Sequence, residues 1–255
     1  MILNLIKGNP TEKHVPNGTG AKINIAEMFC NTVQGEGVHA GVPATFIRLK
    51  DCTLACNWCD TLEVWRHGNT YHVSEILDML KANDMIDKYR NGRQHIVLTG
   101  GSPLLQQEAL ISLINMFVIR FGFKPYFEVE NETVLMPLPE LEFQVECWNN
   151  SPKLANSGMR EKLRYEPEVI HHMSKLNNSW FKFVVSCDED WQEIQMFFLD
   201  RNLISKDQII LMPEGQTREQ LELTREMAVN MAVKHGVRFS DRMHVTVWEI
   251  GRAHV

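Results

Sequence analysis

Two patterns of hydrophobic positions alternate along most of the chain. Short apolar runs of strand length are separated by longer segments in which apolar residues recur at helical spacing. The strand-like runs cover residues 43–49, 95–99, 126–130, 143–147, 180–186, 208–212 and 243–248. The helix-like segments cover residues 74–90, 103–121, 159–176, 189–202 and 217–235. This alternation predicts an α/β fold of parallel βα units, with functional residues on the loops that follow the carboxyl ends of the strands.

Residues at the predicted helix boundaries support these assignments. Ser74 is suited to cap the first predicted helix, and Ser102 followed by Pro103 places a cap before a proline in the first turn of the second. Thr217 fits the start of the last helix as part of a capping box. Gly236 follows that helix, where a glycine can adopt the left-handed conformation that ends it.

Composition and charge narrow the class of protein. The 255 residues are 44% hydrophobic and 23% charged, which is typical of a globular protein with a substantial core. The formal net charge is −6, from 26 basic and 32 acidic residues, so the charge balance does not favour nucleic-acid binding. No uninterrupted apolar run approaches about 18 residues, and the N-terminus lacks the features of a secretion signal. We expect a cytoplasmic protein without a membrane span or a nucleic-acid partner.

The chain is expected to form one domain after an irregular start. Residues 7–22 are rich in Gly, Pro, Asn and charged residues, a composition typical of surface loops. We therefore predict an irregular N-terminal segment over residues 1–22 and a single domain over residues 23–255.

Three of the 6 cysteines lie close together after the first predicted strand. Cys52, Cys56 and Cys59 have the spacing C-x3-C-x2-C, which can direct three thiolates towards one metal centre. A [4Fe-4S] cluster held by three cysteines would retain one iron without a protein ligand, open to a small molecule. A zinc site whose fourth ligand is Cys30, Cys147 or a histidine is the alternative that this spacing leaves open.

Several motifs resemble those of the 7-carboxy-7-deazaguanine synthases, a family of the radical S-adenosylmethionine (SAM) superfamily. The three-cysteine loop, with Trp58 before its last cysteine, is similar to the cluster loop of the superfamily. The resemblance to the family extends from residue 23 to the end of the chain. Its motifs are TVQGEG at 32–37, GVPATFIRL at 41–49, CDT at 59–61, LTGGSPLLQ at 98–106, SPK at 151–153, MPEG at 212–215 and HVTVW at 244–248.

The resemblance implies a fold, a reaction, cofactors and partners. The fold would be a partial (β/α)6-type radical SAM barrel with mostly parallel strands. The reaction would be a lyase-type ring contraction of 6-carboxy-5,6,7,8-tetrahydropterin to 7-carboxy-7-deazaguanine with loss of ammonia, in the biosynthesis of queuosine and other 7-deazapurines. The cofactors would be a [4Fe-4S] cluster, SAM bound at its open iron, and Mg2+. The partners would be an external one-electron reductant of flavodoxin type and a second copy of the chain in a homodimer.

The matching motifs also imply site residues. Cys52, Cys56 and Cys59 would hold the cluster, and Thr61 would ligate Mg2+. The SAM-binding residues would be Trp58, Cys59, Asp60, Gly101, Glu130, Ser151, Pro152, Lys153, Leu211, Met212, Pro213 and Glu214. The substrate-binding residues would be Val33, Gln34, Gly35, Arg48 and Thr99. Because the radical would be generated on SAM, no side chain is assigned as catalytic.

Three of these positions have alternative interpretations. Arg48 offers a bidentate fork for the substrate carboxylate, although a structural ion pair would explain the same residue. Glu130 is chosen over Glu128 as the SAM contact near the end of its predicted strand. Ser102 stands where the family usually has glutamate, and its predicted role is that of a helix cap.

Two other functions remain open from the sequence. A glycyl-radical-enzyme activase of the same superfamily shares the cluster loop but acts on a large protein partner, whereas QGEG at 34–37 and Arg48 suit a small anionic heterocycle. A zinc-binding module without enzymatic activity would share the cysteines alone. Colour separates the two metals, since an iron–sulfur protein is brown and a zinc protein is colourless.

Overall fold

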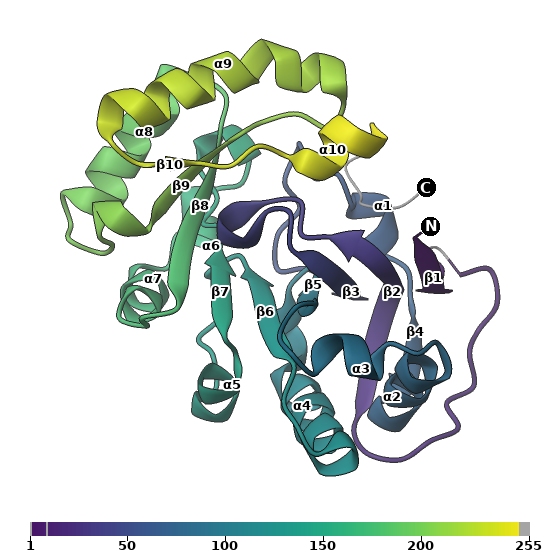
Figure 1. Ribbon diagram of the computed structural model, residues 1–255. Helices are drawn as coiled ribbons and strands as arrows, with labels where there is room; N and C mark the ends of the chain where they lie inside the picture. The colour runs from purple at the N-terminus through teal and green to yellow at the C-terminus, as the bar shows by residue number, and fades with distance from the viewer. Residues whose placement is uncertain (1, 9, 250–255) are drawn as a thin grey trace.

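A curved β-sheet forms the centre of the molecule, with helices packed along one face of it (Figure 1). The computed structural model describes residues 2–8 and 10–249, so residues 250–255 of the predicted domain lie outside the described part. Within the described residues the sheet contains β1 Leu3–Ile6, β2 Lys22–Val33, β3 Pro43–Leu49, β4 Asn69–His72, β5 His95–Gly100, β6 Tyr126–Asn131, β7 Cys147–Asn150, β8 Ser179–Val185, β9 Ile209–Pro213 and β10 Arg238–Phe239.

The sheet is mostly parallel. The strand order is β1-β2-β3-β5-β6-β7-β8-β9-β10, and β4 pairs with β2. β2 pairs antiparallel with β1, β3 and β4, whereas every pairing from β3 to β10 is parallel. This arrangement confirms the predicted α/β fold with mostly parallel strands and is compatible with a partial barrel.

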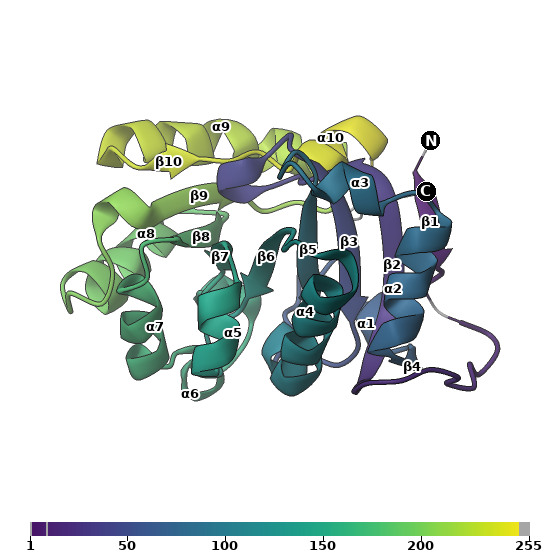
Figure 2. The same cartoon turned by 60° about the horizontal axis from the view of Figure 1, so that its bottom comes forward.

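Helices connect the parallel strands and cover the sheet. They are α1 Leu62–Trp65, α2 Val73–Ala82, α3 Ile86–Tyr89, α4 Gln107–Phe121, α5 Pro139–Gln144, α6 Glu161–Arg164, α7 Pro167–Ser174, α8 Asp188–Ile194, α9 Arg218–His235 and α10 Met243–Trp248. Figure 2 shows α2, α4, α5 and α7 along one side of the sheet, while α9 and α10 lie across one end. That end holds the loops after the parallel strands.

Helix α4 shows how apolar sequence becomes core in this fold. Residues Pro103–Phe121 are long and apolar enough to cross a membrane by length and composition, which the search for uninterrupted apolar runs did not predict. The core helix of a globular protein meets the same criterion. Leu110, Leu113, Ile114 and Phe117 are buried in the same hydrophobic cluster as residues of the sheet. Core packing therefore accounts for the apolar face of this helix.

The structure confirms the predicted elements that have a clear apolar pattern. Predicted strands 43–49, 95–99, 126–130, 180–186 and 208–212 correspond to β3, β5, β6, β8 and β9. The last predicted helix is α9, in which the Thr217 hydroxyl accepts a hydrogen bond from the Gln220 amide at 3.3 Å. Gly236 ends this helix in the left-handed conformation, with φ 63°.

The predicted strand at 243–248 is wrong, because these residues form helix α10. The sheet ends at the short strand β10, and after it the chain turns back over the cavity end of the molecule (Figure 1). The amide of Met243 donates to the carbonyl of Gly35 at 2.9 Å. This tertiary contact holds the segment away from the sheet edge and overrides the β-propensity of its alternating sequence.

Other predicted elements are interrupted. The helix over 74–90 breaks at Asp84, whose φ of 56° is left-handed, and the helix over 159–176 breaks before Pro167, which cannot continue a helix from the preceding turn. The helix over 189–202 changes to a π-helical turn at Gln195–Leu199. The strand at 143–147 is wrong for most of its length, because α5 continues to Gln144 before β7 begins.

The predicted cap at Ser74 is also wrong. Helix α2 begins one residue earlier, with His72 as its N-cap and Glu75 completing the capping box. The Ser74 hydroxyl instead accepts a hydrogen bond from the amide of Thr19 at 2.8 Å. It therefore ties the N-terminal segment to the helix.

The N-terminal region is more ordered than the sequence predicts. Strand β1 lies within the segment 1–22 that was expected to be irregular, although no helix or strand is present over the described residues from 7 to 21. Strand β2 was not predicted, because Asn24, Glu27 and Asn31 interrupt its apolar pattern. Most of β2 is nevertheless buried, and Glu27 is paired with Arg48 of β3.

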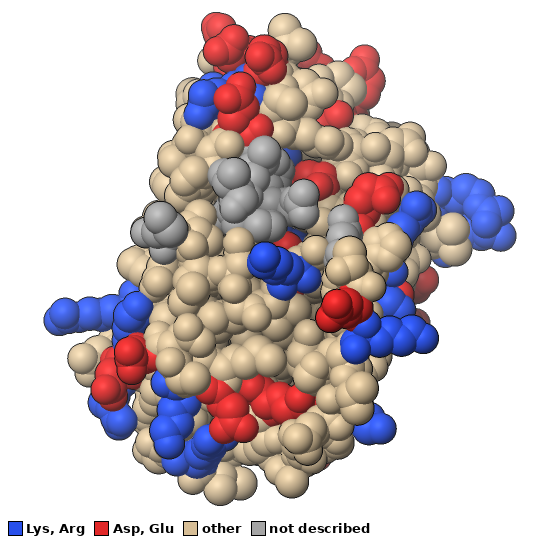
Figure 3. All heavy atoms as spheres, turned by 90° about the vertical axis from the view of Figure 1, so that its right-hand side faces the viewer, with Lys and Arg blue, Asp and Glu red and all other residues tan. Residues whose placement is uncertain are grey.

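Charged side chains are interspersed on the face shown in Figure 3. Asp and Glu lie in small groups beside Lys and Arg, separated by uncharged residues. This face consequently presents no continuous basic surface.

Candidate active site

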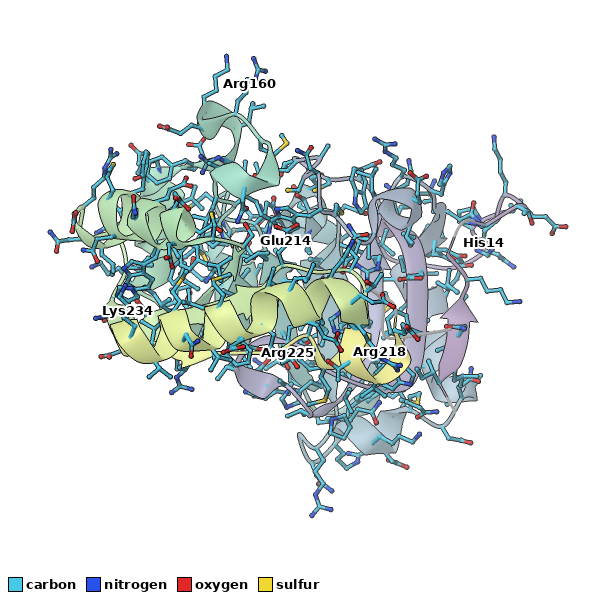
Figure 4. All side chains as sticks on the ribbon, turned by 90° about the horizontal axis from the view of Figure 1, so that it is seen from above. His14, Arg160, Glu214, Arg218, Arg225 and Lys234 are labelled. Atoms are coloured by element: carbon cyan, nitrogen blue, oxygen red, sulfur yellow. The ribbon has the colours of Figure 1, made fainter. Side chains whose placement is uncertain are left out.

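A cavity of about 210 Å³ lies at the carboxyl ends of the parallel strands. Figure 4 looks onto this end of the molecule, with Glu214 near the centre of the view behind α9. Segments from β2 to α10 contribute to the cavity wall. The predicted site residues that line it are Gln34, Gly35, Arg48, Cys52, Cys56, Trp58, Cys59, Asp60, Thr61, Thr99, Gly101, Glu130, Ser151, Lys153, Met212 and Glu214.

Four predicted site residues are not among the residues that line the cavity: Val33, Pro152, Leu211 and Pro213. Leu211 shows the reason, because successive side chains of a strand point to opposite sides. Met212 faces the cavity, whereas Leu211 is fully buried in the hydrophobic core. A ligand contact by these four residues would have to come from backbone atoms, and their assignments stay predictions.

Cys52, Cys56 and Cys59 lie on the loop between β3 and α1, and all three line the cavity as free cysteines. The amide of Cys59 donates to the carbonyl of Cys56 at 3.1 Å, and the amide of Asn57 donates to the carbonyl of Ser157 at 3.0 Å. Burial raises the pKa of the Cys52 and Cys56 thiols, so in the absence of a metal both are protonated at neutral pH. Three sulfur donors facing one cavity fit a soft metal centre.

The spacing of these sulfurs favours an iron–sulfur cluster over a single zinc ion. Zinc holds thiolates at about 2.3 Å, which places their sulfurs about 3.8 Å apart. In the described part of the chain, the group of three potential ligands within 4.8 Å of one another consists of His39, His95 and Glu128, not of the cysteines. The three sulfurs therefore surround a larger space than one zinc ion requires.

The glycine pair after β5 packs directly on the start of the cysteine loop. A Cβ on Gly100, whose φ is +141°, would lie 2.4 Å from the carbonyl oxygen of Leu49. A Cβ on Gly101 would lie 2.0 Å from the carbonyl oxygen of Asp51. These contacts require glycine at both positions, so the pair holds the loop against the sheet as well as facing the cavity.

Ser102 occupies the N-cap position before Pro103, but the predicted capping role of its side chain is wrong. Its hydroxyl is fully buried and donates to Glu132 Oε1 at 2.5 Å. The same oxygen accepts a hydrogen bond from the amide of Thr53 at 3.1 Å and lies 3.7 Å from Cys52 Sγ. Ser102 thus links the cysteine loop to the end of β6.

A buried network of charges forms another wall of the cavity. Lys182 of β8 donates to Glu36 at 2.6 Å and to Glu130 at 3.0 Å. Arg242 donates to Glu36 at 2.9 Å and also to Asp60, next to Cys59. Two basic and three acidic side chains from distant parts of the sequence therefore neutralise much of one another's charge.

The pKa values in this network follow from burial and pairing. Burial would raise the pKa of Glu36, but Lys182 and Arg242 outweigh this effect and hold it well below its ordinary value. Burial raises the pKa of Glu130 above its ordinary value, and Lys182 only partly offsets that increase. Burial would lower the pKa of Lys182, but Glu130 and Glu36 raise it instead, so the lysine stays charged.

Glu128 lies beneath the cavity and does not line it. Burial would raise its pKa, but hydrogen bonds involving His39 and His95 lower the pKa to about 2. Gln34 Nε2 donates to Glu130 at 3.0 Å and to Glu128 at 3.4 Å. Because these carboxylates hold the amide nitrogen, the amide oxygen of Gln34 is the atom left to bind a ligand as an acceptor.

Arg48 has both of the properties that the sequence suggested as alternatives. Its Nε donates to Glu27 Oε1 at 2.7 Å in a buried ion pair. The same side chain lines the cavity, next to Thr99 of the neighbouring strand. The ion pair orients the guanidinium group and does not remove it from the cavity.

Thr61 and Lys153 flank the cysteine loop. Thr61 occupies the N-cap position of α1, but its hydroxyl makes no capping hydrogen bond and lies 3.8 Å from Cys59 Sγ. Lys153 Nζ donates to the carbonyl and the hydroxyl of Ser151 at 2.8 and 2.7 Å and lies 5.6 Å from the Trp58 ring centre. Hydroxyl, ammonium and aromatic groups are thus available on the cavity wall.

Sequence reasoning missed five polar residues that line the cavity: Glu36, Glu132, Lys182, Arg242 and His244. A signal existed for Lys182, because a lysine within the buried apolar strand 179–185 requires a partner. The others are separated from their partners by long stretches of sequence. Their roles become visible only in the folded chain.

Comparison with known proteins agrees with this geometry. Residues 33–129, which include the cysteine loop, match the family model described as a 4Fe-4S single cluster domain. The 7-carboxy-7-deazaguanine synthase of Pyrobaculum aerophilum is 31% identical over 229 residues, covering 89% of this chain and 95% of that protein. The chain belongs to the 7-carboxy-7-deazaguanine synthase family. The resemblance inferred from the motifs is therefore confirmed.

Further relatives of this synthase family match over similar lengths. The 7-carboxy-7-deazaguanine synthase of Halobacterium salinarum is 28% identical over 261 residues, covering 93% of this chain and 95% of that protein. The crystal structure of QueE from Escherichia coli has a TM-score of 0.62 and 23% sequence identity, covering 88% of this chain and 95% of that one. The structural likeness shows the shared fold.

Proposed function

We propose that this protein is a radical SAM lyase that converts 6-carboxy-5,6,7,8-tetrahydropterin to 7-carboxy-7-deazaguanine with loss of ammonia. The observation that carries the proposal is the opening of three cysteine thiols of one loop into the cavity that Arg48 lines. A metal centre and an anionic small molecule could therefore meet in one cavity. Membership of the synthase family selects this reaction among those of the superfamily.

Cys52, Cys56 and Cys59 would hold a [4Fe-4S] cluster, and the SAM beside it would contact the wall that includes Lys153 and Met212. When bound, these two groups supply the radical chemistry that abstracts hydrogen from the pterin. The cavity wall of the protein binds and orients both molecules so that the reacting atoms lie close together.

The chain provides a fitted surface for a flat, carboxylated heterocycle. Phe29 and Phe46 line the cavity and stack on each other with ring centres 5.1 Å apart, so they offer an apolar wall that excludes water. Arg48, oriented by Glu27, would bind the substrate carboxylate through its guanidinium fork. The amide oxygen of Gln34 would accept a hydrogen bond from the amino or N–H groups of the pterin.

We also propose Mg2+ bound to Thr61, a flavodoxin-type reductant, a homodimer and a cytoplasmic location. The support for Mg2+ is the Thr61 hydroxyl, which makes no capping bond and faces the cavity. Magnesium is commonly bound by few protein ligands, with substrate and water oxygens completing its shell. The reductant, the dimer and the location rest on the family resemblance alone.

Product analysis tests the reaction directly. The protein, reconstituted with iron and sulfide without oxygen, is incubated with reductant, SAM, Mg2+ and the carboxypterin. Mass spectrometry should show SAM-dependent formation of the carboxydeazaguanine and release of ammonia. An iron-loaded protein that binds SAM but consumes no carboxypterin would contradict the proposed reaction.

Replacing Arg48 with lysine should weaken substrate binding selectively. A point charge cannot replace the guanidinium fork, so we expect the KM for the carboxypterin to rise at least about tenfold while the Kd for SAM stays unchanged. Steady-state kinetics and equilibrium dialysis measure the two quantities. Arg93→Lys, at an exposed position, is the matched control. Equal losses for both ligands would show that Arg48 only supports the fold.

Replacing Thr61 with alanine should reduce the response to magnesium. Losing a protein oxygen ligand is expected to raise the Mg2+ concentration for half-maximal turnover about tenfold. Thr61→Ser retains the hydroxyl and should respond like the parent protein. If Thr61→Ala has the parent's magnesium dependence, this hydroxyl does not bind the ion.

A further inference from the structure

Glu132 is a buried carboxylate beside the cysteine loop with one oxygen that the protein does not use. The residue is 5% exposed and lines the cavity. Its Oε1 accepts hydrogen bonds from the hydroxyls of Ser102 at 2.5 Å and Thr53 at 3.0 Å. Its Oε2 is buried and has no hydrogen-bond partner within the described part of the protein. A buried carboxylate oxygen without a donor is costly, so a ligand donor at this position would be strongly favoured.

The surroundings of Glu132 define the charge of that donor. Burial raises the pKa of the Cys52 and Cys56 thiols, and the negative charge of Glu132 adds to this increase. The carboxylate is therefore close enough to act electrostatically on the groups that would become thiolates. Negative charge gathered in a buried site favours a cationic ligand. A group with N–H donors and a positive charge satisfies both requirements.

We propose that Glu132 binds the α-ammonium group of SAM through Oε2. This inference rests on the proposed function and names a binding residue that the sequence motifs did not indicate. The aminoacyl part of SAM carries an ammonium and a carboxylate group. Glu132 and Lys153, which both line the cavity near the cysteines, offer the matching pair of opposite charges.

Ser102 explains why the carboxylate comes from Glu132. The family usually has a glutamate at this position of the glycine loop, where this chain has a fully buried serine. The smaller side chain leaves room for the carboxylate of Glu132, which arrives from the end of β6 and is fixed by the serine hydroxyl. The glycine loop therefore positions the acid in this protein and does not supply it.

The test measures SAM binding without turnover. Parent protein and variants are reconstituted with iron and sulfide without oxygen, and no reductant is added. Equilibrium dialysis gives the Kd for SAM and for an analogue in which hydrogen replaces the α-amino group. Iron content is measured in every sample. Glu140→Gln, at an exposed position in α5, is the matched control for removing one negative charge.

Glu132→Gln should weaken SAM binding at least about tenfold and leave binding of the deaminated analogue unchanged. Ser102→Ala, which keeps the carboxylate but removes one of its donors, should cause a smaller loss that is again confined to SAM. Parent-like SAM binding by Glu132→Gln, or equal weakening of both ligands, would overturn the proposal. If Glu132→Gln does not load iron, Ser102→Ala decides by the same comparison. An iron-loaded parent that binds no SAM would instead contradict the proposed function itself.

Discussion

Replacing Cys56 with alanine is expected to abolish both the cluster and the activity. Reconstituted parent protein should contain about four irons per chain, because the cavity presents three thiols from one loop. With two thiols left, one of them partly exposed, we expect iron content close to background. Turnover should fall by at least about a thousandfold, since no side chain can supply the radical chemistry of the missing group. Iron and sulfide assays, visible absorption and product analysis measure the effect.

Cys187 provides the matched control for this substitution. It is an exposed free cysteine at the N-cap of α8 and does not belong to the residues that line the cavity. Cys187→Ser should therefore keep the iron content and activity of the parent protein. Unchanged iron in Cys56→Ala, or stoichiometric zinc in place of iron in the parent, would contradict the cluster assignment.

The predictable part of the fold depends on local apolar patterns. Strands β3, β5, β6, β8 and β9 are mostly buried and have short apolar runs, so their positions follow from the sequence. β2 is equally buried, but part of its polarity is explained by the ion pair of Glu27 with Arg48 on the next strand. A pairing between two strands cannot be inferred from the pattern of one. The same limit applies to α10, whose alternating residues predict a strand until its contact with Gly35 is known.

The predictable part of the site is the set of contiguous motifs. The cysteine loop, QGEG and the glycine pair bring chemistry-bearing residues into one short segment each, and the α/β fold brings the segments together. Lys182 and Arg242 lie 146 and 206 residues from Glu36 in the sequence, yet both donate to it. Ser102 could be recognised as unusual, but its bond to Glu132 depends on how two βα loops pack. Charge pairing across the cavity is thus a property of the fold.

Replacing Lys182 with methionine should cost both stability and substrate binding. Methionine has a similar length but leaves Glu36 and Glu130 without their shared buried cation. Breaking a buried ion pair on one side costs about 3–5 kcal/mol, which for a chain of this size lowers the Tm by on the order of 10 °C. Because the pKa of Lys182 is raised in the folded protein, its stabilising charge is present at every pH below its ordinary value and is lost only above it. Thermal unfolding at neutral pH therefore measures the full effect.

A second substitution separates the loss of charge from the loss of packing. In the Lys182→Met background, Glu130→Gln removes one of the two carboxylates that lost their partner, while Glu36 keeps its bond to Arg242. If uncompensated charge is the cause, the double variant should unfold at a higher temperature than Lys182→Met alone, so that the two changes are not additive. Lys175→Met, at an exposed position, controls for the loss of a lysine and should unfold with the parent protein. A double variant that is less stable than either single variant would mean that Lys182 acts through packing. The charge network would then position ligands without stabilising the folded chain.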